Sequence, residues 1–208
     1  VILVASMMLS IGGCGLKKKN DSKILEGNWK ADLECEKIVT DELSKDEDAK
    51  SNNMAMIDAI KKYADFNELE AIVTFKFNQD GTYSIEPDLE QWNSTWGAFS
   101  TAALNGAREY YKSIGVGDAM VEGFESKEEF LGYSIAYSLM DLRIPITKAV
   151  FVQQNGKYKA INGKLYINKD SSKDVDITTD YYGTYEITGE SELTVKNRDG
   201  VEYICQKE

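Results

Sequence analysis

The C-terminal part of the chain alternates apolar and polar residues in short runs. Between residues 149 and 206 lie the β-prone runs AVFVQQ, KYKAI, KLYIN, DVDIT, TYEIT, ELTVK and VEYICQ. Three turn pairs lie among them, Asn155-Gly156, Asn162-Gly163 and Asp199-Gly200. These residues tolerate the positive φ angles of a two-residue hairpin turn. The pattern therefore predicts an antiparallel meander, and closure into a barrel would bury one face and remove both sheet edges.

The sequence between residues 25 and 86 predicts strands and one short helix. Residues 25–36 (LEGNWKADLECE) are expected to form the first strand, and residues 69–86 a hairpin whose turn is NQDG. The charged residues 41–53 predict a solvated loop. Apolar residues at helical spacing then predict a short amphipathic helix over residues 54–66.

A helical block is predicted between the hairpin and the meander. Asp88 with Gln91, and Ser126 with Glu129, have the spacing of capping boxes that open helices. The first helix carries one apolar face and is broken at residues 115–117, where two glycines flank a valine. A helical turn is expected over residues 118–124, and the second helix is expected to end at Pro145. Residues 88–145 are thus predicted to be an all-helical insertion.

Composition limits the fold and the chemistry. With 208 residues, of which 42% are hydrophobic, the chain can hold one large domain with an insertion, and we expect an α+β, mainly β fold. The formal net charge of −11 argues against a nucleic-acid partner. The sequence contains no His, which excludes a Ser-His-Asp hydrolase and a His-ligated zinc enzyme. No cofactor is expected.

The N-terminal run VILVASMMLSIGGCG is typical of the apolar part of a signal peptide. Its residues Ile11-Gly12-Gly13-Cys14 resemble the lipobox of bacterial lipoproteins. The resemblance implies lipidation of Cys14, cleavage after residue 13, and a membrane-anchored protein on the extracytoplasmic face. The alternative is an ordinary secretory signal with a chance cysteine. We expect residues 1–13 to be the signal peptide, 14–24 a lipidated tether, and 25–208 the folded domain.

Gly27-Asn28-Trp29 has the G-x-W form that opens the first barrel strand in the lipocalin and calycin group. Residues 179–181 (TDY) resemble the second motif of that group. The run Tyr185 to Gly200 makes the chain similar to lipocalin-like lipoproteins of Gram-positive gut bacteria. The resemblance implies that Trp29 packs across the barrel floor. The sequence has no clear equivalent of the basic residue that covers this Trp in the family, and Arg198 and Lys207 are the two possibilities. The alternative for Trp29 is an ordinary core aromatic.

Aromatic residues are the candidate ligand-binding groups. Trp92 and Trp96 lie one helical turn apart, so they could stack on sugar rings or cover the mouth of the barrel. The alternative is core packing, which this spacing on an apolar stripe favours. Together with Trp29 and Tyr133 they form the predicted lining for a small apolar or carbohydrate ligand, held between the barrel mouth and the helices.

Two cysteines test barrel closure. Cys35 is expected on the first strand and Cys205 on the last, and these strands pair in a closed meander. A disulfide between them would close a loop of roughly 170 residues, worth on the order of 5 kcal/mol in the chain-entropy model. Two buried free thiols are the alternative.

Acidic clusters offer the remaining candidate chemistry. Residues 41–48 contain five carboxylates but lack the spacing of an EF-hand calcium loop. Catalysis without His would need paired carboxylates, and Glu122, Glu125, Glu128 and Glu129 form one group while Asp174 and Asp176 form another. The first group opens a helix, where acidic residues are favoured, and the second lies at the start of a strand. Neither spacing singles out two carboxylates that face a common substrate. We therefore expect a monomeric, non-catalytic binding lipoprotein. The alternatives are a protein-interaction or inhibitor lipoprotein with a filled barrel, and a carboxylate-based surface hydrolase.

Overall fold

A closed antiparallel barrel forms one end of the molecule in the computed structural model, which describes residues 21–116 and 123–208. Its strands are β1 (Gly27–Asp32), β2 (Ile72–Phe77), β3 (Thr82–Pro87), β4 (Gln154–Ile161), β5 (Lys164–Asn168), β6 (Tyr181–Thr188), β7 (Glu192–Asn197) and β8 (Glu202–Lys207). Each strand pairs with the next, and β8 closes the barrel on β1, where Ala31 lies opposite Cys205. The predicted α+β fold, with a meander that closes into a barrel, is confirmed. The closed eight-stranded barrel is consistent with a lipocalin-like one.

Aromatic side chains fill the barrel interior. Alternate residues of each strand point inward, so Trp29, Phe75, Phe77, Tyr158 and Tyr203 are all buried. The Phe75 and Tyr203 ring centroids lie 5.1 Å apart, and those of Phe77 and Tyr158 lie 4.8 Å apart. Eight-stranded barrels have an interior just wide enough for such filling.

Some predicted strands and turns are wrong in detail. AVFVQQ spans the end of a helix and the loop after it, and DVDIT lies in the loop between β5 and β6. Asn155 and Gly156 lie inside β4, where a Cβ on Gly156 would be 2.0 Å from the Asn168 oxygen, so glycine is needed for close strand approach. The Asn162-Gly163 turn is confirmed, with φ angles of 51° and 73°. Asp199 and Gly200 also lie in a turn, but the loop holds residues 198–201 rather than two residues.

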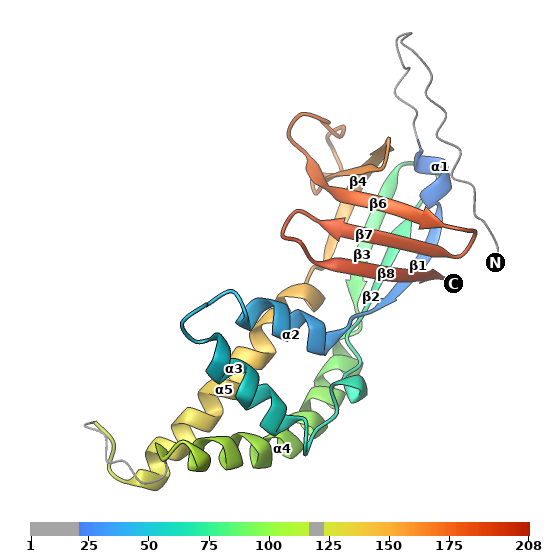
Figure 1. Cartoon of the computed structure of the whole chain (residues 1–208). Coiled ribbons are helices and arrows are strands. Elements are labelled where there is room, and N and C mark those ends of the chain that lie inside the picture. The colour runs from blue at the N-terminus through green and yellow to red at the C-terminus, as the bar shows by residue number, and fades with distance from the viewer. Residues whose placement is uncertain (1–20, 117–122) are drawn as a thin grey trace, which may run out of the picture.

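Helices form the other end of the molecule (Figure 1). Before β1 lies the short α1 (Ser22–Leu25). Between β1 and β2 lie α2 (Cys35–Leu43), α3 (Lys50–Ile60) and a short 3₁₀ helix, η1 (Phe66–Glu68), and between β3 and β4 lie α4 (Leu89–Ser113) and α5 (Lys127–Val150). Figure 1 places α1 beside the barrel, far from the end where α4 meets α5. None of the described helices is long and apolar enough to cross a membrane.

The helical predictions need three corrections. The first strand ends at Asp32 rather than residue 36, and Cys35 begins α2 instead. Residues 41–53 are partly helical, because α2 and α3 occupy both ends of that stretch, and α3 ends at Ile60 rather than residue 66. Helix α5 continues through Pro145 to Val150, because the residues of its last turns are buried in the core and packing outweighs the lost hydrogen bond. The turn expected over residues 118–124 lies mostly outside the described residues.

Capping residues fix where α4 and α5 begin. The Asp88 side chain accepts a hydrogen bond from the Gln91 backbone N–H, and the Ser126 hydroxyl accepts one from the Glu129 backbone N–H. Gln91 does not complete a capping box, since its side chain donates to Glu70. The two long helices that begin at these caps lie at one end of the barrel (Figure 1), where the end of α5 helps to shape a groove.

Candidate functional site

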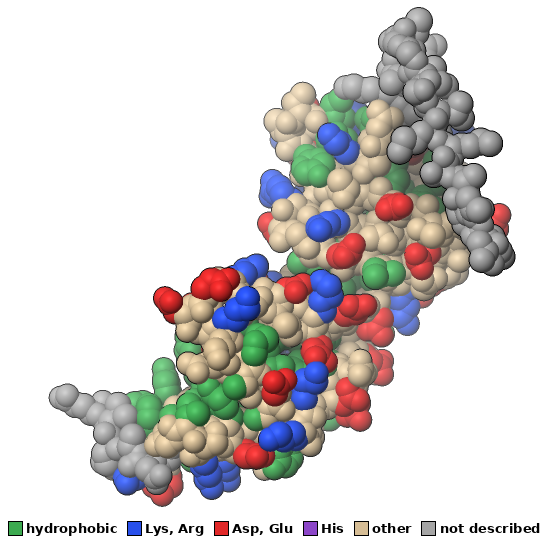
Figure 2. Space-filling view, in the orientation of Figure 1, with side chains coloured by type: hydrophobic (Ala, Val, Ile, Leu, Met, Phe, Trp, Pro, Cys, Tyr) green, Lys and Arg blue, Asp and Glu red, His purple; other side chains and the backbone are tan. Residues whose placement is uncertain are grey.

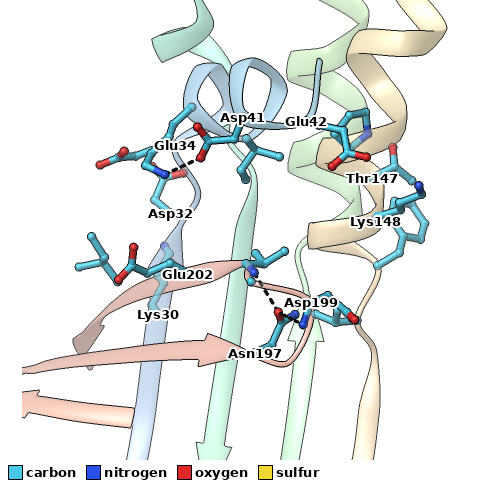
Figure 3. Close-up of a pocket in the computed structure, with 18 of the residues that line it drawn as sticks. Lys30, Asp32, Glu34, Asp41, Glu42, Thr147, Lys148, Asn197, Asp199 and Glu202 are labelled. Atoms are coloured by element: carbon cyan, nitrogen blue, oxygen red, sulfur yellow. Dashed lines mark hydrogen bonds and ion pairs between the residues drawn. The ribbon is translucent and has the colours of Figure 1, made fainter. Parts of the chain in front are cut away.

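A groove of about 1650 Å³ lies outside the barrel, between its wall and the helices. Figure 3 shows its walls, with α2 and the end of α5 facing β1, β8 and the β7–β8 loop. Strand alternation supplies the floor, because Trp29 and Ala31 point into the barrel while Lys30 and Asp32 point out of it. On β8, Ile204 likewise points outward, between the buried Tyr203 and Cys205. The groove is therefore built from the outer faces of the two strands that close the barrel.

Apolar residues form one part of the groove. Phe151 and Ile204 both line it, and they remain 49% and 46% exposed. Three half-buried residues, Ile38, Val152 and Val201, lie among the other lining groups. Large aliphatic and aromatic side chains left exposed inside a hollow are a common feature of binding sites.

Charged residues surround this apolar part. Lys37 bonds to Asp41 at 2.6 Å, and Lys45 bonds to Glu42 at 2.5 Å. The other carboxylates form no ion pair within the described part of the chain, and these are Asp32, Glu34, Asp199, Glu202 and Glu208. Among the described residues, Lys30, Lys148 and Lys207 also lack an ion pair. Unpaired acidic groups thus outnumber unpaired lysines.

Electrostatics distinguish two residues of the groove. Burial raises the pKa of Asp32 above its usual value, and the nearby carboxylate of Glu70 raises it further. The hydrogen bond and charge of Asp41 raise the pKa of Lys37, to which Glu202 and Glu34 add. Seven carboxylates and five lysines line the groove, and this excess of negative charge favours cationic ligand groups.

Trp29 lies beneath the groove rather than in it. Its indole N–H donates to the Leu25 carbonyl at 2.7 Å, and the Lys207 ammonium lies 5.1 Å from its ring centroid. Of the two basic residues proposed to cover this Trp, the structure therefore identifies Lys207. Lys207 also lines the groove, so the residue that covers the Trp29 ring borders the candidate site.

The four predicted ligand-binding aromatics do not come together. Trp29 is in the barrel, whereas Trp92 and Trp96 are buried on α4 with ring centroids 5.6 Å apart. Trp96 also packs on Phe99. Tyr133 is exposed on α5, and none of the four lines the groove. The two α4 tryptophans are thus placed as core residues, the alternative that their spacing favoured.

The predicted carboxylate groups also lie away from the groove. Asp174 and Asp176 lie in the β5–β6 loop, where Asp174 bonds to Lys157 at 3.2 Å. Asp176 accepts hydrogen bonds from Thr178, which lower its pKa. Glu125, Glu128 and Glu129 lie at the start of α5, and Glu122 lies outside the described residues. The described members of each group do not face a common cavity.

The acidic residues 41–48 are engaged locally. Asp41 and Glu42 bond to lysines as described, and Asp46 accepts hydrogen bonds from the backbone N–H groups of Asp48 and Ala49. In residues 21–116 and 123–208, no three His, Cys, Asp or Glu side chains converge as metal ligands.

Cys35 and Cys205 are two buried free thiols in this structure. The Cys205 side chain points into the barrel, opposite Ala31, while Cys35 begins α2 beyond the end of β1. Burial raises the pKa of each thiol to about 12, so both are protonated at neutral pH. Barrel closure therefore brings β1 to β8 without joining the two cysteines.

The sequence analysis did not identify several of the residues that line the groove. Ile204 was visible as an apolar residue on the wet side of the last strand, and Lys30 and Asp32 as the outward residues of the first. Phe151 was assigned to a strand and so was not considered a surface group. What could not be seen was that α2 and α5 face this wall. Comparison of the chain with protein-family models, with curated proteins and with solved structures gave no match.

Proposed function

We propose that the protein is a lipid-anchored binding protein that holds a polypeptide segment in the groove and carries out no chemistry on it. The observation that carries the proposal is the combination of exposed Phe151 and Ile204 with unpaired carboxylates in one hollow outside a filled barrel. Protein partners supply apolar and charged side chains side by side, which is what such a surface requires.

The size and position of the groove favour a polypeptide over a small ligand. Small-molecule sites are mostly enclosed and fall at roughly 300–1,000 Å³. This groove is larger, at about 1650 Å³, and it lies on the outer wall of the barrel. The barrel interior, where a lipocalin-like protein would store a ligand, is occupied by Trp29, Phe75 and Tyr203.

The charges of the groove indicate the chemistry of the segment. Asp32, Glu34 and Glu202 lie on or beside the paired strands and carry no ion pair among the described residues. A bound segment would therefore present Lys or Arg to these carboxylates and place apolar residues on Phe151 and Ile204.

The anchor in this proposal is Cys14, in the lipobox-like run that ends the apolar N-terminal segment. It lies outside the described residues. Two or three acyl chains give lasting attachment where one would be marginal. Helix α1, which overlaps the end of the predicted tether, lies beside the barrel, so this anchor would be on the barrel side of the molecule (Figure 1). Metabolic labelling with an alkyne fatty acid tests it, since the label would be lost in Cys14→Ser.

Peptide selection tests the groove. The full chain with Cys14→Ser would be immobilised and panned with a random peptide phage library. We expect enrichment of sequences that combine Lys or Arg with apolar residues. The selected peptide should bind the double variant Phe151→Ala, Ile204→Ala at least tenfold more weakly.

Leu104→Ala provides the matched control, since Leu104 is exposed to a similar extent on α4, away from the groove. It should leave peptide affinity unchanged. Selected peptides that bind the double variant and the unmodified groove equally would contradict the proposal.

A further inference from the structure

Helix α5 has two apolar faces, and within the described part of the chain only one of them is buried. On the other face Phe124 packs on Phe130 and Tyr133 near the start of the helix. Ile135, Leu142 and Ile146 are buried against the rest of the protein. On the opposite side Tyr133, Tyr137, Met140 and Ile144 are exposed by 57%, 55%, 57% and 43%, and we call these four residues the α5 stripe. A helix that is apolar on both sides is normally covered on both sides. Figure 2 shows hydrophobic side chains on the surface of this helical block.

The spacing of the stripe indicates what covers it. Its residues follow one another by four, three and four positions, and half-buried Phe130 precedes Tyr133 by three. This is a repeat of 3.5 residues, the period that keeps one side of a helix against a second helix. Ala136, which lies next to Tyr137 on the exposed side, is a small residue. A small residue at that position allows another helix to approach closely.

We propose that the partner helix is α5 of a second copy of this chain, packed antiparallel. Aromatic residues occupy the first half of the stripe and aliphatic residues the second half. In an antiparallel pair centred between positions 137 and 140, each Tyr137 faces Met140 of the other copy, and each Tyr133 faces Ile144. Sulfur–aromatic and aromatic–aliphatic contacts then repeat by two-fold symmetry, as an isologous interface requires.

Charges permit this arrangement. Beside the central layers, Asp141 faces Ser134 of the second copy and Arg143 faces Ala136, so like charges do not meet there. Lys127 and Lys148 approach one another only at the two ends, where solvent screens them. A parallel pair would instead set Arg143 beside Lys148 of the second copy, next to the apolar layers.

The size of the contact makes the dimer weak in solution, and attachment of both copies to a membrane would strengthen it. Two helices of 24 residues share a contact about 36 Å long, and a strip about 10 Å wide buries roughly 700 Å² in total. Stable interfaces bury about 1,200–2,000 Å². Confinement of both copies to one membrane raises their effective concentration, which favours association. This inference does not depend on the proposed groove function, although the membrane confinement rests on the proposed anchor. The dimer is an alternative to the expected monomer.

Sedimentation velocity of the full chain with Cys14→Ser tests the dimer. We expect the average mass to rise from one chain toward two between about 1 μM and about 1 mM, the range of a weak complex. Met140→Glu should remove this rise. Ile204→Glu, an equally drastic change at a similarly exposed residue in the groove, should keep it. A single-chain mass at every concentration, or a dimer unaffected by Met140→Glu, would overturn the proposal.

Cysteine cross-linking in the same background tests the direction of the helices. In the antiparallel pair the two copies of position 140 are offset by only about 4.5 Å along the axis, whereas those of position 133 are offset by about 16 Å. Mild oxidation should therefore link Met140→Cys and not Tyr133→Cys. Linkage at both positions would indicate parallel helices and overturn the antiparallel arrangement. A monomer whose binding to phosphatidylglycerol vesicles is lost in Met140→Glu would instead assign the stripe to the membrane.

Discussion

The barrel and the helical block differ in how completely they cover their apolar side chains. Among the described strand residues, only Tyr181 and Ile204 are large hydrophobic groups that remain exposed. The long helices α4 and α5, with the residue that follows α5, leave six such groups exposed, namely Leu104, Tyr133, Tyr137, Met140, Ile144 and Phe151. The barrel satisfies its own packing because alternate residues meet in a closed interior. The helices do not, and this makes the barrel a scaffold while the helices and their junction with it present binding surfaces.

The sharpest test of this contrast replaces one aromatic residue from each region. Phe75 is buried in the barrel against Tyr203, so Phe75→Ala should lower the free energy of unfolding by about 3–5 kcal/mol. Phe151→Ala, in the exposed groove, should change it by less than about 0.5 kcal/mol. Urea unfolding followed by far-UV circular dichroism measures both. Equal losses would show that Phe151 is part of the core and would break the comparison.

A second test compares two glycines within the helical block. A Cβ on Gly106 of α4 would lie 2.5 Å from the Ile60 Cα atom, so α3 and α4 could not keep their present separation. Gly106→Ala should therefore destabilise the protein by about 1–3 kcal/mol.

Gly132→Ala on α5 is its matched control, because open space surrounds that position. It should stabilise the protein by about 0.4–1 kcal/mol through the unfolded state. Thermal unfolding of both variants would distinguish the packed side of the block from the open one. A loss of stability in Gly132→Ala would mean that this position is already covered within one chain.

The smallest expected effect concerns pH. Burial raises the pKa of Asp32 in the groove, so the folded state disfavours its charge. This penalty is absent below the unfolded pKa, develops as the pH rises through the folded pKa, and is fully present at neutral pH. Asp32→Asn should therefore stabilise the protein slightly at pH 7 and have no effect near pH 3.

Asp80, in the turn between β2 and β3, should respond in the opposite sense. Hydrogen bonds from Thr82 lower its pKa, so its contribution to stability is present above the unfolded pKa and lost as the pH falls. Asp80→Asn should destabilise the protein at pH 7 and approach neutrality at low pH. Urea midpoints at several pH values test both variants, and the same sign for both would contradict this assignment.

Much of the barrel could be predicted because its determinants are local. Alternation in Val73, Phe75 and Phe77 identified a strand, and Asn162-Gly163 identified a turn whose φ angles the chemistry of these residues permits. Closure followed from the need to pair the outer strands. Asn155-Gly156 misled, since the same dipeptide occurs inside a strand when close packing requires glycine.

The candidate site could not be predicted in the same way, because it depends on how distant elements face one another. Trp92 and Trp96 were the most visible aromatics, and packing on α4 buries them. Ile204 and Phe151 are far from Asp32 in the sequence. All three line one groove because the barrel closes and because α5 continues past Pro145. Proline disfavours the interior of a helix, but tertiary packing of the last turns outweighs that preference here. The sequence pattern alone therefore predicted a helix that ends too early.

Hydrogen exchange of the full chain with Cys14→Ser, with and without a peptide selected on it, tests the central claim most directly. The account predicts slower amide exchange at residues 30–38 and 197–207, which form two walls of the groove, and unchanged exchange at residues 130–144 of α5. Protection confined to residues 130–144, or protection only of strands β4 to β6, would contradict the account by placing the bound segment elsewhere.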